Sequence, residues 1–122
     1  MIQFFKNGGI GMFPILGLGL AVLATALAFA RTGRRETEGF LERLLRATAW
    51  TTVVAFATNL MAVGFYVAKM DRAEIGQIVC ALSEGVAEAL SPVAFGGGFL
   101  VLAWTLAAIG RRRLDARLPA SA

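Results

Sequence analysis

Hydroxyl and amide side chains within long apolar stretches are the residues of this chain that could line a path for ions, and four of them form the hypothesis. Thr52, Thr58 and Asn59 lie in one apolar stretch, and Ser91 begins another. A path for protons through an apolar environment needs hydroxyls, amides or water, because an isolated charge there is costly. The four residues are therefore a candidate ion path. In the alternative interpretation, each threonine hydroxyl donates to a carbonyl of its own helix and serves packing alone.

Enzyme chemistry is not indicated by the remaining residues. An active site needs acids, bases or nucleophiles that share one place, whereas the apolar stretches contain no charged residue. The chain has no histidine, and Cys80 is its single cysteine, so neither an internal disulfide nor a metal site is expected. Gly96, Gly97 and Gly98 lie inside an apolar stretch, where they are expected to permit close helix contact. We expect no enzyme, no metal and no cofactor.

Three apolar stretches are long enough to cross a membrane as helices. They cover residues 11–30, 47–68 and 91–109 of the 122-residue chain. About 20 apolar residues span the hydrocarbon core, and a soluble core helix rarely stays apolar on all faces for this length. The composition agrees, since 57% of the residues are hydrophobic and 16% are charged. The sequence predicts a single all-α membrane domain with three transmembrane helices.

The segments between the stretches are helical in pattern. Residues 31–46 predict a turn followed by an amphipathic extension of the second span. Residues 71–90 predict an amphipathic helix that leads into the third span, with Pro92 either in the first turn of a new helix or at a kink of a continuous one. Its apolar stripe is expected to contact a partner or the membrane surface, and Glu84 and Glu88 share the other face. The stripe is formed by Ile75, Ile78, Val79, Leu82, Val86 and Leu90.

The arginines predict the orientation. They gather in the linker 31–46 and in the basic tail 110–122, whereas Lys6 is the single basic residue before the first span. Positive residues favour the cytoplasmic side, so the N-terminus is expected outside and the C-terminus in the cytoplasm. The net charge of +4 is thus explained by the membrane, and no nucleic-acid partner is expected.

Small residues recur at helical spacing and favour self-association. Spacings of four let helices approach closely in lipid, and three helices alone bury little surface. We therefore expect a homo-oligomer in contact with membrane lipid. The small residues are Gly17, Gly19, Ala24 and Ala28 in the first span, and Ala103, Ala107 and Gly110 near the third.

Two short motifs carry a family resemblance. The opening run 5–16 pairs a glycine-containing stretch with Pro14 at the start of the first span, and Gly85, Glu88, Ala89 and Leu90 form a Gly-x-x-Glu-Ala-Leu signature before the third. Together with the topology, they make the chain similar to a reduced member of the MotA/TolQ/ExbB proton-channel family. The resemblance implies a pentamer around single-span partners of the ExbD/TolR kind that carry a membrane aspartate. It also implies a stator-type complex in the inner membrane of a bacterium.

The chain departs from the family pattern in two ways that bear on conduction. The resemblance places a large cytoplasmic insertion between the first two spans, where this chain has the short linker 31–46. It also places a threonine after the signature, where this chain has Val93, with Ser91 nearby. Three hypotheses follow: an oligomeric ion-channel or stator-like subunit, a structural or assembly subunit without ion flow, and, ranked last, a protein that handles lipids or small molecules.

Overall fold

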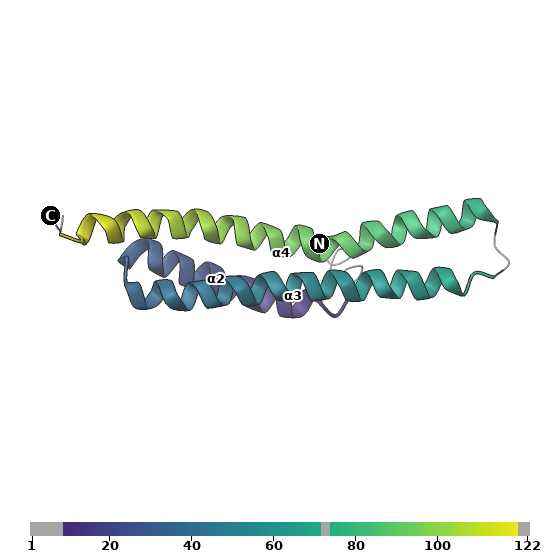
Figure 1. Ribbon diagram of the computed structural model, residues 1–122, viewed down its shortest axis with the longest axis horizontal. Coiled ribbons are helices and arrows are strands. Elements are labelled where there is room, and N and C mark those ends of the chain that lie inside the picture. Colours follow the sequence, from purple (N-terminus) through teal and green to yellow (C-terminus); the bar gives the residue numbers. More distant parts are fainter. Residues whose placement is uncertain (1–8, 72–73, 120–122) are drawn as a thin grey trace.

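The computed structural model describes residues 9–71 and 74–119, which form three helices and short connections without a strand. The helices are α2 (Met12–Thr32), α3 (Arg35–Ala68) and α4 (Ile75–Arg117) (Figure 1). All three are long and apolar enough to cross a membrane. The prediction of an all-α chain with three transmembrane helices is therefore confirmed. Lys6, the first part of the opening motif and the end of the basic tail lie outside the described residues.

Helix α2 ends at a glycine that turns the chain directly into α3. Gly33 has a left-handed backbone conformation (φ 60°), and its N–H donates to the carbonyl of Phe29 at 2.8 Å. Glycine adopts this conformation without the steric cost that a Cβ imposes. Arg34 follows with an extended backbone, and α3 starts at Arg35. The expected turn thus occupies two residues, and the amphipathic extension is the first part of α3.

Helix α4 is continuous through its proline. It runs for 43 residues with Pro92 inside it, and it bends near its middle (Figure 1). A proline inside a helix removes one backbone hydrogen bond and favours a kink. Pro92 is fully buried in the bundle, so packing holds it in place. Of the two predicted alternatives, the structure shows the continuous helix, in which the amphipathic segment leads straight into the third span.

The bundle core lies where all three helices run together. Large side chains fit against small ones: a Cβ added at Gly110 would meet the ring of Phe29, and one added at Gly19 would meet the ring of Phe99. Such contacts give close van der Waals packing, which drives helix association in lipid. The buried core cluster is formed by Val22, Ala26, Phe29, Leu41, Leu45, Leu100, Ala103 and Ala107.

Beyond the start of α2, the α3–α4 hairpin continues as two helices (Figure 1). There α4 turns its small residues toward α3, since a Cβ at Gly85 would meet Val63 and Ala89 is buried. The larger apolar stripe of α4 faces outward: Ile75 is 81% exposed and Leu82 is 46% exposed. The stripe is therefore open in a single copy, and its contact with a partner or with the membrane surface stays a prediction.

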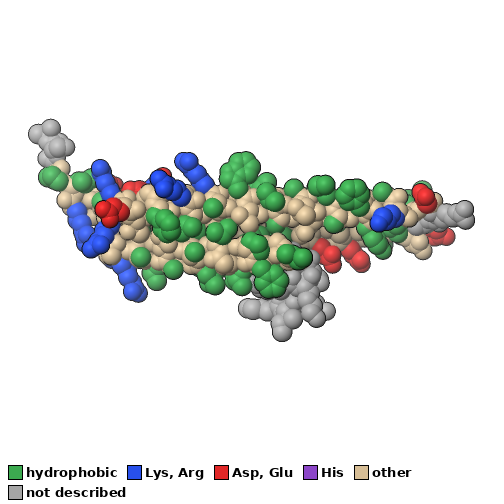
Figure 2. All heavy atoms as spheres, turned by 90° about the horizontal axis from the view of Figure 1, so that it is seen from below, with side chains coloured by type: hydrophobic (Ala, Val, Ile, Leu, Met, Phe, Trp, Pro, Cys, Tyr) green, Lys and Arg blue, Asp and Glu red, His purple; other side chains and the backbone are tan. Residues whose placement is uncertain are grey.

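The basic residues of the linker and of the tail gather at one end of the molecule (Figure 2). Arg111 forms ion pairs from α4 to Glu38 at 2.8 Å and to Glu42 at 3.0 Å on α3. Arg113 and Arg117 donate to the carbonyl oxygens of the last turn of α2. Two arginine-rich segments that are distant in sequence thus form one basic end.

Candidate ion path and the grooves between α3 and α4

Thr52 is the deepest residue of the candidate ion path. It is buried on the side of α3 that faces α4, and a Cβ at Gly96 would meet its side chain. Its Oγ1 donates to the carbonyl of Thr48 at 2.8 Å. The hydroxyl oxygen can still accept a hydrogen bond, but the proton is already bonded within α3. Gly96 therefore makes the predicted helix contact, whereas Gly97 and Gly98 have no neighbour within 4 Å of a Cβ.

The other threonines follow the packing interpretation. Thr58 is exposed, and its Oγ1 donates to the carbonyl of Val54 at 2.8 Å. It lies about 120° around the helix axis from Thr52, since an α-helix has about 3.6 residues per turn. A hydroxyl bond to the carbonyl four residues earlier is made by every threonine that the sequence placed at membrane depth: Thr25, Thr48, Thr51, Thr52, Thr58 and Thr105.

Asn59 and Ser91 are the other two residues of the candidate ion path, and with them the four residues still do not form a continuous polar line. Asn59 is half-buried and lies two turns beyond Thr52 on the same side of α3. Ser91 is half-buried on α4, and Val93, at the position where the resemblance places a threonine, is 39% exposed. The structure thus brings Thr52 and Asn59 to one face and leaves Thr58 outside it.

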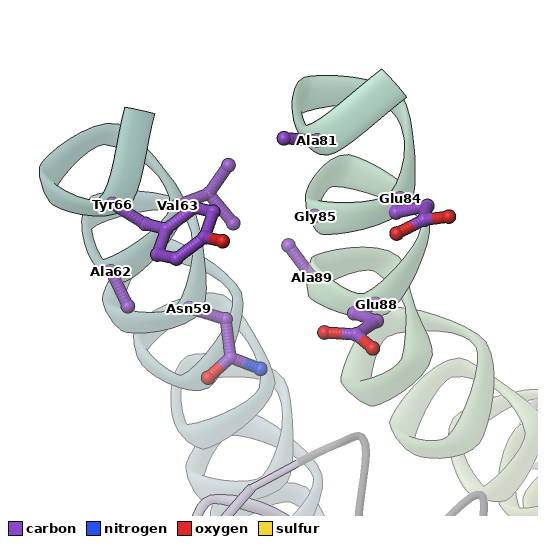
Figure 3. Close-up of a pocket in the computed structure, with 9 residues that line it drawn as sticks. All are labelled: Asn59, Ala62, Val63, Tyr66, Ala81, Glu84, Gly85, Glu88 and Ala89. Carbon is purple, nitrogen blue, oxygen red and sulfur yellow. The ribbon is translucent and has the colours of Figure 1, made fainter. Parts of the chain in front are cut away.

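A groove that the sequence analysis did not predict adjoins Asn59 (Figure 3). This groove, here the Asn59 groove, encloses about 450 Å³ between the end of α3 and the first half of α4. Figure 3 shows the Glu88 carboxylate on the side of α4 nearest Asn59, while Glu84 points away from α3. The spacing of Asn59 and Tyr66 by seven residues was the available signal. Its lining residues are Asn59, Ala62, Val63, Tyr66, Ala81, Glu84, Gly85, Glu88 and Ala89.

The signature residues have separate positions around this groove. Gly85 and Ala89 form the contact with α3, Glu88 lies at the groove with an exposed side chain, and Leu90 is 48% exposed on the outer face. Small residues at Gly85 and Ala89 let the two helices approach. The motif therefore has a packing explanation in this chain whatever its further role.

A second groove, here the arginine groove, lies at the basic end between α3 and α4. It encloses about 800 Å³. Its floor is apolar and its rim carries arginines and carboxylates. No local sequence pattern indicates this groove, because its residues come from segments about 60 positions apart. They are Phe29, Glu38, Leu41, Glu42, Leu45, Arg46, Ala49, Trp104, Ala107, Ala108, Arg111, Arg112 and Asp115.

Neither groove holds a set of metal ligands within the described part of the chain, where no group of three or more His, Cys, Asp or Glu residues could hold a metal ion. Comparisons with protein-family models, with curated proteins and with solved structures find no match. The fold and the site thus define a three-helix membrane protein with polar groups between its two long helices.

Proposed function

We propose that this chain is a subunit of an oligomeric membrane complex of the proton-channel or stator type, in which it couples an ion-motive force to a partner protein. The observation that carries the proposal is the open surface of α3. In the most apolar 18-residue segment of this helix, 11% of the segment is buried within one copy. A spanning helix left so open is covered by lipid or by other protein chains. The exposed small residues of α2, Gly17, Ala24 and Ala28, and the outward stripe of α4 favour further copies of this chain. Gly19, Ala103, Ala107 and Gly110 are instead buried within one copy. The resemblance to the MotA/TolQ/ExbB family favours five copies.

The three apolar stretches contain no carboxylate, so in the proposed complex a partner supplies it. They offer hydroxyls and one amide, so a proton relay needs a carboxylate from a partner, such as a single-span chain of the ExbD/TolR kind. Thr52 and Asn59 share the face that would lie toward such a carboxylate if the path follows the α3–α4 contact. In this arrangement Ser91 contributes from α4, and Thr58 contributes only where two copies meet.

The localisation belongs to the same proposal. The linker and the tail place their arginines at one end of the molecule (Figure 2). By the positive-inside rule that end lies in the cytoplasm. Helices α2 and α4 both run toward it, so the N-terminus lies outside the bacterial inner membrane.

A non-conducting structural or assembly subunit is the alternative, and one observation favours it. The hydroxyls of Thr52 and Thr58 both donate within α3, which leaves no line of exchangeable protons in one copy. In this alternative the three-helix unit anchors a larger complex, and the grooves accommodate other subunits.

Ion flux in reconstituted vesicles separates the two functions. The chain and any co-purifying partner are placed in proteoliposomes, and proton uptake is followed with a pH-sensitive dye under an imposed gradient. Flux that falls in Thr52→Val and in Asn59→Leu, but not in the matched control Thr25→Val on α2, supports conduction along the α3–α4 face. Absence of flux at every driving force, with an intact oligomer by native mass measurement, moves the assignment to the structural alternative.

A further inference from the structure

Helix α2 sets the depth of the molecule in a bilayer. Its 21 residues extend about 31 Å at 1.5 Å per residue, which equals the thickness of the hydrocarbon core. Helix α4 matches it, because Gly19 adjoins Phe99 and Phe29 adjoins Gly110. The predicted first and third spans are therefore level with one another.

The predicted second span, residues 47–68 of α3, is displaced along the bundle axis relative to the first and third spans. Gly11, at the start of α2, adjoins Ala55, and α3 runs in the opposite direction. Arg46 precedes Ala55 by nine residues, so its backbone lies about 14 Å further toward the basic end. That level is near Leu20, in the middle of α2. The structure therefore sets the apolar stretch 47–68 nearer the other end than the spans beside it.

An arginine at this depth needs a partner or water. A lipid-facing guanidinium within the hydrocarbon is energetically costly, and a long side chain reduces this cost by extending toward the headgroups. Arg46 is exposed in the single copy and lines the arginine groove together with Arg111 and Arg112. The groove thus offers its guanidinium a route toward the basic end.

Some charged residues of the arginine groove form ion pairs with one another and others do not. Glu38 and Glu42 both pair with Arg111, at 2.8 and 3.0 Å. Among the described residues, Arg46 and Arg112 have no carboxylate within ion-pair distance, and Asp115 is the third acid of the lining. Two cations on opposite helices therefore face one groove without an ion-pair partner, and the surrounding end of the molecule is rich in further arginines.

The arginine groove also has an apolar wall beside its cations. Trp104, which is 57% exposed, and Leu45, Ala49 and Ala108 line it together with the arginines. The groove thus leads along an apolar wall from the level of Arg46 and Trp104, inside the hydrocarbon, to Arg112 near the basic end, where phospholipid headgroups lie.

We propose that the arginine groove binds an anionic membrane phospholipid, with its phosphate between Arg46 and Arg112 and an acyl chain along Trp104 and Ala108. Basic pockets between transmembrane helices commonly take such headgroups. The Arg46 side chain extends along the groove toward the basic end, where the bound phosphate gives its guanidinium an anionic partner. This inference depends on membrane insertion and not on ion conduction, so it stands or falls separately from the proposed function.

Lipid retention by the purified full chain tests the proposal. Native mass measurement in mild detergent is made after addition of phosphatidylglycerol or of phosphatidylcholine. Wild type is expected to retain phosphatidylglycerol about thirtyfold better, and Arg46→Gln with Arg112→Gln is expected to remove that preference, since each of the two arginines contributes about 1 kcal/mol near anionic lipid. The matched control Arg34→Gln with Arg35→Gln alters two arginines outside the groove and is expected to keep the preference.

A second measurement places the lipid and guards against misfolding. In a Trp50→Phe background, brominated phosphatidylglycerol is expected to quench Trp104 fluorescence more than brominated phosphatidylcholine, and Arg46→Lys with Arg112→Lys is expected to keep this difference. Equal retention of both lipids, or loss of the preference in the control, overturns the proposal. Displacement of the lipid signal by inorganic phosphate alone also overturns it, because the groove would then be a site for a free anion.

Discussion

Arg117, the last residue of α4, donates from Nη1 to the carbonyl oxygen of Thr32, the last residue of α2, at 2.6 Å. Arg113 makes the equivalent bond to the carbonyl of Arg31 at 3.2 Å. The last carbonyls of a helix have no partner within it, and they carry the negative end of the helix dipole. The tail of α4 therefore satisfies the end of α2, which joins the two parallel helices across 85 positions of sequence.

The two bonds from Arg113 and Arg117 to the end of α2, here the Arg117 clamp, are expected to stabilise the basic end of the fold. Arg113→Ala with Arg117→Ala should lower the free energy of unfolding by about 1 kcal/mol, since each bond is charge-assisted but exposed. Thermal unfolding in detergent, followed by circular dichroism, measures the loss. Arg35→Ala is the matched control, because its side chain makes no such bond within the described residues. Equal effects in both variants would show that the clamp adds nothing.

Gly96 is expected to be the most sensitive of the three consecutive glycines. Gly96→Ala places a Cβ against the side chain of Thr52, and overpacking of this kind costs about 1–3 kcal/mol. Gly98→Ala, with open space at its Cβ, should be neutral or slightly stabilising because alanine favours helix. The double variant Gly96→Ala with Thr52→Ala should recover part of the loss. A Gly96→Ala protein as stable as wild type contradicts the contact.

A substitution at Gly97 can test contacts between copies of the chain rather than contacts within one copy. Its Cβ position has no neighbour in the chain, so Gly97→Leu should leave the fold of the monomer intact. If the third span packs against another copy here, the oligomer mass measured in native conditions should shift toward smaller species. Unchanged mass and unchanged thermal stability would place Gly97 against lipid.

Gly33 is expected to resist replacement for a conformational reason. Its φ of 60° is unfavourable for a residue with a Cβ, so Gly33→Ala should destabilise the protein by about 1 kcal/mol. Gly39→Ala, inside α3 and in open space, should instead stabilise by up to about 1 kcal/mol. Chemical unfolding of the two variants should therefore shift the midpoint in opposite directions. A shift in the same direction would contradict the left-handed turn.

The orientation prediction is testable with introduced thiols. In a Cys80→Ser background, a membrane-impermeant reagent should label Lys6→Cys in intact cells and should label Arg112→Cys only after the membrane is opened. Labelling of Arg112→Cys from outside would reverse the assignment of the basic end.

The sequence predicted what depends on local composition. The three spans, the amphipathic segment before Pro92 and the backbone bonds of the threonines follow from hydropathy, periodicity and short-range geometry. The depth of α3 did not follow, because the stretch 47–68 is apolar by itself and its displacement arises from the contacts of Ala55 with Gly11 and of Thr52 with Gly96. Both grooves were missed for the same reason, since each combines residues of α3 and α4 that no local pattern connects.

The two ends of the bundle differ in mechanical constraint. At the basic end, a two-residue turn at Gly33 and the bonds of Arg113 and Arg117 fix α2 to both long helices. Beyond Asn59, which Gly9 adjoins, the described part of the hairpin is held by its own contact across Gly85 and Val63. The α3–α4 hairpin is thus fixed where the three helices pack together and extends from there as two helices. A small tilt at that base is multiplied along about 20 Å of α3 between Ala55 and Ala68, so the largest displacements occur where α3 ends and α4 begins. A force applied at that end of the hairpin would act with a longer lever arm than the same force applied at Asn59.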